Sequence, residues 1–214
     1  MIDPISWEFS WPYILTAFIG GYSIGSVPFG LIFTQMSGIG DIRDIGSGNI
    51  GATNVLRTGK KGIAAATLTA DILKGACAAL IGMQFGPDIA VVAALGAFLG
   101  HLFPIWLKFR GGKGVATAVG IILALSWQVG LIALAVWLLA AALLRYSSLA
   151  ALLGAVAAPL AAWWFATPQL VELYAVISIL IWIKHYQNIK RLLTGQESKI
   201  GAKADTYSAN DGGC

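Results

Sequence analysis

Long stretches without a charged residue are the feature that most limits what this chain can fold into. Residues 9–40, 89–107, 114–144 and 146–171 contain no Asp, Glu, Lys or Arg. A helix needs roughly 20 apolar residues to cross the hydrocarbon core of a bilayer, and only helices or closed barrels satisfy the backbone polar groups there. Because these runs are continuously apolar rather than alternating, they predict transmembrane helices.

The composition excludes the other fold classes. The chain is 57% hydrophobic and only 11% charged, whereas soluble domains contain about 25% charged residues. The same figures exclude a disordered or collagen-like chain. The first apolar run is not a signal peptide, because Asp3 and Glu8 precede it where a basic segment is required.

The positions of Lys and Arg predict the topology. These residues occur only in alternate hydrophilic breaks, apart from Lys74, which lies inside an apolar run. Because cytoplasmic loops are enriched in Lys and Arg, this alternation predicts an N-terminus outside, a C-terminus in the cytoplasm and an odd number of crossings. The expected fold is an all-α, polytopic membrane bundle of about seven transmembrane helices.

Residues 114–144 decide the count. As one helix this run would be about 46 Å long, against a core of about 30 Å. Lys113 and Arg145 flank it and both belong to cytoplasmic breaks, so an even number of crossings is needed. We therefore expect a short helix, a turn at residues 126–128 and a second helix. The predicted spans are roughly 12–34, 62–85, 89–107, 114–125, 129–145, 148–166 and 170–186.

The chain is expected to form one integral-membrane domain. This domain covers residues 1–200, in which no internal repeat is visible. Residues 201–214 are polar and Gly-rich, and we expect them to form a disordered tail.

The first cytoplasmic segment, residues 40–61, has the chemistry of an anion site. Residues 46–51 match G-x-G-x-x-G, but no strand precedes them, so a dinucleotide fold is not indicated. Glycines let backbone N–H groups approach an anion closely, and Arg57 adds a fork suited to phosphate. A solvated Gly-rich loop is the alternative. The candidate residues are Ser47, Gly48, Asn49, Thr53, Asn54 and Arg57.

The second segment, residues 100–117, contains Arg-Gly-Gly-Lys-Gly at 110–114. It lacks the spacing of a Walker A loop, yet it leads directly into an apolar helix, and a helix N-terminus binds anions readily. Lys108 and Arg110 could instead serve only as cytoplasmic anchors. The candidate phosphate-binding residues are Gly111, Gly112, Lys113 and Gly114.

The third segment, residues 184–195, places His185 and Asn188 on one face of a helix end. His185 could be a base or a donor, or an interfacial histidine among anchoring bases. Ser148 follows Arg145 at the cytoplasmic start of another span; it could donate to a ligand or cap that helix.

Other residues, and motifs that are absent, restrict the kinds of reaction that the chain can catalyse. Asp71 and Lys74 lie three residues apart inside a span, where charges are usually paired or line a pathway. The chain has no His-x-x-x-x-Asp acyltransferase motif and no G-x-S-x-G elbow. It also has no carboxylate cluster with metal-ligand spacing, so we expect no metal site.

Together the three segments resemble the PlsY family, the integral-membrane, acyl-phosphate-dependent glycerol-3-phosphate acyltransferases of bacteria. The resemblance covers about residues 12–200. The residues that carry it are S-G-N-I-G-A-T-N-V-L-R at 47–57, G-H-L-F-P-I-W-L-K-F-R-G-G-K-G-V-A-T at 100–117 and H-Y-Q-N-I-K-R-L at 185–192.

The resemblance implies transfer of a fatty acyl group from acyl phosphate to glycerol 3-phosphate. The products are 1-acylglycerol 3-phosphate and phosphate, which begins phospholipid synthesis. It also implies a bacterial cytoplasmic membrane protein that acts from the cytoplasm on these two substrates among membrane lipid. We expect no cofactor, no nucleic-acid partner and function as a monomer. By motif position, Ser47, His185 and Asn188 are the expected catalytic residues, beside Arg57 and Lys113, with Ser148 in support.

Two questions stay open in the sequence. The proton acceptor is either His185 or the phosphate of the acyl donor, which the scarcity of carboxylates favours. The alternative function is a transporter of an anionic phosphorylated metabolite, which would share the basic segments and the Asp71–Lys74 pair. Transporters often contain inverted repeats, and none is visible here.

Overall fold

Helices and loops form the whole of the part that the computed structural model describes, which is residues 7–201. The predicted tail lies outside the described residues, apart from Gly201. The helices are α1 (Trp7–Gly25), α2 (Phe29–Met36), α3 (Ala52–Leu56), α4 (Lys61–Met83), α5 (Pro87–Leu102), α6 (Val115–Leu125), α7 (Trp127–Leu144), α8 (Ser147–Phe165), α9 (Pro168–Lys184) and α10 (Tyr186–Leu193), with 3-10 turns η1 (Ile42–Asp44) and η2 (Ile105–Leu107).

The first apolar run differs from its prediction, because a break divides it into α1 and α2. Pro28 has no N–H with which to continue a helix. The carbonyl groups exposed by the break find distant donors: Trp106 Nε1 donates to the Ser26 carbonyl and Lys74 Nζ to the Val27 carbonyl, both at 2.9 Å. These side chains lie far along the sequence, so the apolar pattern alone could not locate the break.

The prediction for residues 114–144 is confirmed as a helix pair. The short α6 ends where Ser126 leaves helical geometry, with φ −155°, and α7 begins at the next residue. All the predicted span positions therefore correspond to helices of similar bounds, with the first one broken.

Close helix packing depends on small residues. A Cβ atom at Gly25 of α1 would lie 1.9 Å from the Ala97 carbonyl oxygen of α5, and one at Gly120 of α6 would lie 1.9 Å from the Ile72 carbonyl oxygen of α4. Helix backbones approach this closely in membranes where Gly or Ala occupies the contact. The glycines thus hold α5 against α1 and α6 against α4.

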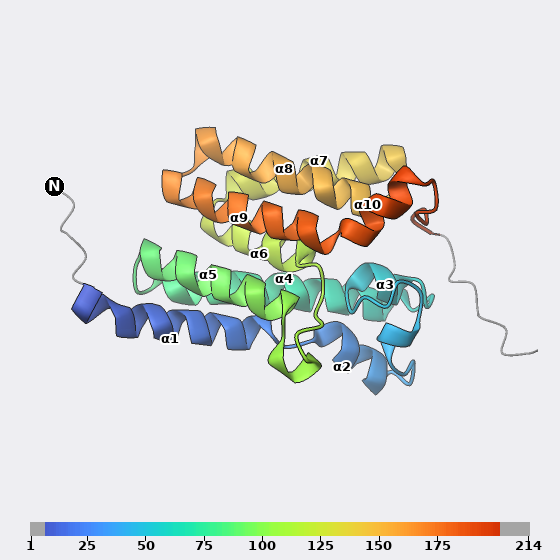
Figure 1. Cartoon of the computed structure of the whole chain (residues 1–214), viewed down its shortest axis with the longest axis horizontal. Coiled ribbons are helices and arrows are strands. Elements are labelled where there is room, and N and C mark those ends of the chain that lie inside the picture. Colours follow the sequence, from blue (N-terminus) through green and yellow to red (C-terminus); the bar gives the residue numbers. More distant parts are fainter. Residues whose placement is uncertain (1–6, 202–214) are drawn as a thin grey trace, which may run out of the picture.

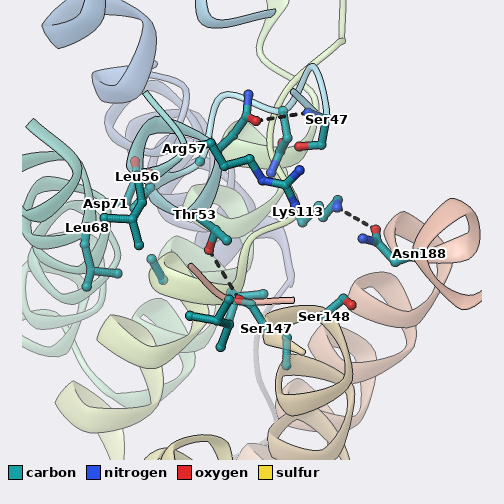
Figure 2. A pocket seen from close by; sticks show the side chains of 18 of the residues that line it. Ser47, Thr53, Leu56, Arg57, Leu68, Asp71, Lys113, Ser147, Ser148 and Asn188 are labelled. Atoms are coloured by element: carbon teal, nitrogen blue, oxygen red, sulfur yellow. Dashed lines mark hydrogen bonds between the residues drawn. The ribbon is translucent and has the colours of Figure 1, made fainter. Parts of the chain in front are cut away.

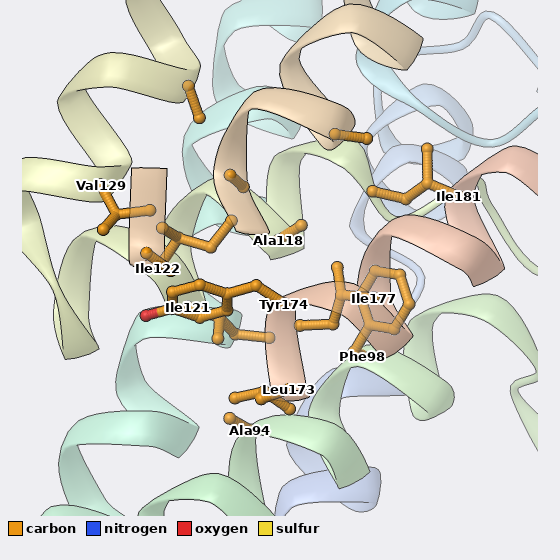
Figure 3. Packing of buried hydrophobic residues seen from close by; sticks show 14 of the residues in the cluster. Ala94, Phe98, Ala118, Ile121, Ile122, Val129, Leu173, Tyr174, Ile177 and Ile181 are labelled. Atoms are coloured by element: carbon orange, nitrogen blue, oxygen red, sulfur yellow. The ribbon is translucent and has the colours of Figure 1, made fainter. Parts of the chain in front are cut away.

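Two apolar clusters stabilise the bundle. The larger one lies among the helices from α4 through α9 and includes the buried residues Phe98, Ile121, Tyr174 and Ile177 (Figure 3). The smaller one consists of Leu31, Ile42, Ile50, Val55 and Ala64. It packs α2, η1, α3 and α4 together and so supports the loop of the first motif.

The outer surface suits a bilayer. Leu143, Leu160 and Trp164 are among the large apolar side chains that stay exposed. Five segments among the described residues are long and apolar enough to cross a membrane by length and composition, while α6 is a shorter apolar helix. Figure 1 shows the long helices side by side, with the start of α1 and the end of α10 at opposite ends of the bundle.

Candidate active site

A cavity of about 490 Å³ lies at the end of the bundle where α3, α4, α6, α8 and α10 meet (Figure 2). Residues of all three sequence motifs line it, so the structure brings them together. Polar and charged groups line one part of this cavity. Apolar side chains of α4, α6 and α7 line another part, among them Leu68, Ile72, Val119, Leu134 and Trp137.

Asn54 holds the loop of the first motif. Its Nδ2 donates to the carbonyls of Ile42 at 3.0 Å and Ile45 at 2.9 Å, and its Oδ1 accepts from the backbone N–H of Ser47 at 3.0 Å. Both amide hydrogens are therefore used within the protein. Asn54 was predicted as a donor to phosphate; it lines the cavity, and its amide hydrogens hold the loop in shape.

The loop in turn supports Arg57, which lines the cavity at the end of α3. Gly46 has φ +58°, and a Cβ atom there would lie 2.6 Å from Asn54 Oδ1 and 3.1 Å from Arg57 Cδ. Glycine at this position therefore allows the side chains of Asn54 and Arg57 to pack beneath the loop. The Arg57 guanidinium donates to Ser198 Oγ.

The remaining candidates of the first motif divide into two groups. Ser47, Asn49 and Thr53 line the cavity, and the Thr53 hydroxyl lies 3.3 Å from that of Ser147. The backbone N–H of Gly48 instead donates to the Ile45 carbonyl at 3.1 Å. Gly48 therefore stabilises the turn, and its predicted role as a phosphate donor is not what its N–H does here.

Two glycines of the second motif also differ from prediction. The N–H of Gly111 donates to the Leu102 carbonyl at 3.2 Å, and that of Gly112 donates to the His101 carbonyl at 3.0 Å. Because α5 ends at Leu102, these N–H groups satisfy carbonyls at its C-terminus. They are not available to hold a phosphate, as the motif had suggested.

The candidate anion site of this motif lies directly after these glycines. Lys113, Gly114, Val115 and Ala116 line the cavity where α6 begins. The first N–H groups of a helix have no acceptor within it, and the N-terminus carries a partial positive charge that attracts anions. Gly114 has φ +83°, and a Cβ atom there would lie 2.4 Å from the Phe98 ring, so this turn requires glycine.

Lys113 joins the second motif to the third. Its Nζ donates to Asn188 Oδ1 at 2.5 Å, and Asn188 Nδ2 donates to Glu197 Oε1 at 2.6 Å. Figure 2 shows Lys113 and Asn188 directed toward one another, with Arg57 on the same side of the pocket as Lys113.

Burial also changes the acidity of Lys113. It lowers the pKa of the ammonium group to about 8; the nearby Glu197 carboxylate opposes this change, and the charges of Arg191 and Arg57 add to it. Lys113 is therefore mostly charged at neutral pH and loses that charge in mild alkali.

His185 is buried and faces the cavity as a neutral ring. Its Nδ1 lies 2.8 Å from the Ile181 carbonyl oxygen. Because a carbonyl can only accept, Nδ1 carries the hydrogen and Nε2 is left as an acceptor. Burial lowers the pKa of this histidine to about 4, and the charge of Lys113 adds to the effect.

Glu197 is a site residue that the sequence analysis missed. Its carboxylate accepts from Ser148 Oγ at 2.7 Å, from Asn188 Nδ2 at 2.6 Å and from Arg191 Nε at 2.7 Å. Burial raises the pKa of Glu197, but these hydrogen bonds outweigh it and the net pKa is lowered. The available signal was its position as the sole acidic residue in the basic stretch 184–200.

The predicted pairing within α4 is confirmed. Lys74 Nζ lies 2.7 Å from Asp71 Oδ1, and both side chains are at least 96% buried. His101 Nδ1 lies 3.7 Å from the same oxygen. Asp71 and His101 also line the cavity.

Comparison with known proteins identifies the family. The sequence model of the family described as "Glycerol-3-phosphate acyltransferase" matches residues 15–195. The chain is 59% identical to the glycerol-3-phosphate acyltransferase of Mesorhizobium japonicum over 89% of this chain and 97% of that protein. It is 57% identical to that of Nitrobacter winogradskyi over 90% of this chain and 99% of that protein.

Solved structures agree with the sequence comparison. The fold is similar to the crystal structure of PlsY, an integral membrane glycerol 3-phosphate acyltransferase, in its glycerol 3-phosphate form, with a TM-score of 0.83, 38% identity and coverage of 88% of this chain and 96% of that chain. The lysophosphatidic acid form of PlsY matches with a TM-score of 0.81 and 37% identity over 88% of this chain and 95% of that chain. The resemblance drawn from the three motifs is thereby confirmed, and the chain belongs to the glycerol-3-phosphate acyltransferase family.

Proposed function

We propose that the chain transfers a fatty acyl group from acyl phosphate to glycerol 3-phosphate, giving 1-acylglycerol 3-phosphate and inorganic phosphate. Relatives that share more than half of its residues are named glycerol-3-phosphate acyltransferases, and one similar PlsY structure is a glycerol 3-phosphate form. The same relatives give no support to the alternative of a metabolite transporter. The chain is therefore an acyltransferase that begins phospholipid synthesis.

One observation carries the proposal: a single cavity has both a cationic and an apolar part. Arg57, Lys113 and the first turn of α6 supply positive charge and free N–H groups. Leu68, Val119 and Trp137 belong to the apolar lining. Both substrates carry a phosphate and one also carries an acyl chain, so the two parts match the two substrates together.

The cationic part holds the reactants in place. Arg57 and Lys113 bind the phosphates as charge-assisted hydrogen-bond donors, with Ser47, Asn49 and Thr53 at the same wall and the N-terminus of α6 beneath. This arrangement keeps the attacking hydroxyl near the acyl carbon and stabilises the negative charge that develops in the transition state. Glu197 positions Ser148 and Asn188 through the hydrogen bonds described above.

The apolar part takes the acyl chain. Leu68 and Ile72 of α4 face this space with Val119 of α6 and Trp137 of α7. Burying a methylene contributes about 0.8 kcal/mol, so a chain lying here contributes to affinity along its length. The acyl carbon then lies where the apolar lining meets the charged one.

The reaction needs a proton acceptor, and the leaving phosphate can serve. The C1 hydroxyl oxygen of glycerol 3-phosphate attacks the acyl carbon, and the bond from that carbon to the bridging phosphate oxygen breaks. Phosphate leaves with the bonding pair and takes the hydroxyl proton. A general base works best with a pKa near the operating pH, and the pKa of His185 at about 4 is far below it. His185 and Asn188 therefore orient the reactants.

The orientation in the membrane follows from the charges at this end of the bundle. Seven spans, of which α6 is the shortest, place the N-terminus outside and the C-terminus in the cytoplasm. Lys60, Arg110, Arg145 and Lys190 belong to the breaks at the pocket end, as cytoplasmic loops require. The pocket thus opens to the cytoplasm from the bacterial cytoplasmic membrane.

The chain works as one domain and as a monomer. The residues that line the cavity lie between positions 47 and 201, so the site draws on most of the length of the domain. We expect residues 1–200 to act as that single domain.

The test is phosphate release from palmitoyl phosphate and glycerol 3-phosphate by the purified protein in detergent, with the acylated product identified by mass spectrometry. The wild type is expected to form both products. Arg57→Ala and Lys113→Ala are each expected to lower kcat/KM by at least about tenfold, because each removes a charged hydrogen-bond donor. Arg110→Ala, in an exposed residue of the same loop, is the matched control. Release without an acylated glycerol product would contradict the proposal.

A further inference from the structure

The Asp71 carboxylate has an oxygen that the protein itself leaves without a partner. Lys74 Nζ and His101 Nδ1 approach the same oxygen, Oδ1, at 2.7 and 3.7 Å. Among the described residues no hydrogen bond or ion pair to Oδ2 is found, whereas Oδ1 and His101 Nδ1 are buried with no hydrogen-bond partner. A buried polar group without a partner is costly, and Asp71 lines the cavity, so this group is placed to receive a ligand.

Asp71 lies close to the loop of the proposed anion site, and this position restricts which ligands it could bind. His101 Nε2 lies against Gly112, so close that a Cβ atom on Gly112 would be 2.1 Å away. His101 therefore connects Asp71 to the loop that precedes the N-terminus of α6. Figure 2 shows Asp71 and Leu68 on the α4 side of the pocket, away from Asn188.

The charges of Asp71 and Lys74 restrict the possible ligands further. A carboxylate can only accept hydrogen bonds and would repel a phosphate. Lys74 already balances its charge, so a cation is not needed. The Asp71 carboxylate is therefore suited to accept a hydrogen bond from a neutral donor such as a hydroxyl. Acyl phosphate has no hydroxyl donor of this kind, whereas glycerol 3-phosphate has one besides the hydroxyl that reacts.

We propose that Asp71, oriented by Lys74 and flanked by His101, accepts a hydrogen bond from the C2 hydroxyl of glycerol 3-phosphate and selects this acceptor. The proposal rests on the proposed function of the same pocket. It explains why an ion pair inside the bundle borders the cavity. A bound C2 hydroxyl donates to the carboxylate, whereas an acyl-accepting molecule without this hydroxyl leaves the carboxylate at the cavity wall without that donor, which discriminates between the two molecules.

The experiment compares two acceptors, glycerol 3-phosphate and 3-hydroxypropyl phosphate, which keeps the reacting hydroxyl and the phosphate but lacks the C2 hydroxyl. For the wild type, kcat/KM is expected to be about tenfold to hundredfold higher with glycerol 3-phosphate, as for a hydrogen bond to a charged group. Asp71→Asn is expected to reduce this ratio to within about threefold of one, mainly through the rate with glycerol 3-phosphate. Asp88→Asn, in an exposed carboxylate of α5, should leave the ratio unchanged.

The ratio is independent of the fraction of enzyme that folds, so it separates a specific effect from a structural one. Asp71→Asn lowering both rates equally would overturn the proposal, because Asp71 would then act on the reacting hydroxyl or only on the fold. Equal wild-type rates with the two acceptors would overturn it even if the variant cannot be purified. In that case the proposed function would survive, whereas transfer to neither acceptor would contradict the function as well.

Discussion

Lys113 is the residue whose chemistry depends most directly on its surroundings. With its pKa lowered to about 8 by burial, about nine-tenths of the side chains are charged at pH 7 and about one-tenth at pH 9. The charged form binds phosphate, and the substrate phosphates have their second pKa near 6, so they do not change in this interval.

The kcat/KM for glycerol 3-phosphate is therefore expected to fall about tenfold between pH 7 and pH 9. In Lys113→Arg the side chain stays charged throughout this range, so the alkaline fall should disappear even if the absolute rate is lower. A pH profile of phosphate release measures both. An unchanged alkaline fall in Lys113→Arg would assign it to another group.

His185 makes a separate prediction at this scale. Its pKa of about 4 keeps the ring neutral at neutral pH, and Nε2 can only accept from a neighbouring donor. A glutamine carbonyl can accept similarly, so His185→Gln is expected to lower kcat by less than tenfold. A loss of several thousandfold with unchanged KM would instead identify His185 as the general base.

Single residues also mark how far the sequence could predict the site. The motifs correctly indicated that Arg57, Lys113, His185 and Asn188 would line one pocket, because phosphate chemistry demands these residue types. They could not indicate that the Asn54 amide would be used by the loop, since that depends on carbonyls at Ile42 and Ile45 that only the folded loop brings near. Glu197 was missed for the same reason.

At the scale of single elements, the short α6 and the turn before it form the proposed anion site. Gly114→Ala is expected to lower stability by about 1–2 kcal/mol for the left-handed backbone alone, and more because the new methyl group would collide with Phe98. We also expect a large loss of activity, since the turn aims Lys113. Thermal unfolding in detergent and the phosphate-release rate measure the two effects.

The matched control for this prediction is Gly62→Ala. A Cβ atom at Gly62 in α4 meets nothing within 4 Å, and alanine favours a helix over glycine. Its unfolding midpoint should therefore stay the same or rise. If Gly114→Ala behaved like Gly62→Ala, the account of the α6 turn would be wrong.

The helices themselves were the most predictable elements. Apolar length and the spacing of basic breaks indicated helices at these positions, including the short one at residues 114–125, because the bilayer thickness restricts helix length so strongly. The division into α1 and α2 was not predicted. It depends on donors from Lys74 and Trp106, which the local pattern of residues 26–28 does not contain.

For the whole molecule, the proposed reaction requires three separate segments of the chain to lie at one face of the membrane. The alternation of basic breaks predicted this arrangement, and the cavity contains residues from all three segments. We assign that face to the cytoplasm, because the acyl acceptor and the acyl donor must both reach the cationic part of the cavity from there.

Cysteine labelling tests this claim most directly. Cys77 and Cys214 are replaced by Ser, and single cysteines are introduced at exposed Ser47, Arg110 and Gln196 on the pocket side and, in a separate variant, at Asp88. A membrane-impermeant maleimide applied to intact spheroplasts is expected to label only Asp88→Cys, and the other three should react only after the membrane is opened. Labelling of Ser47→Cys from outside while Arg110→Cys reacts only from within would contradict a shared cytoplasmic site.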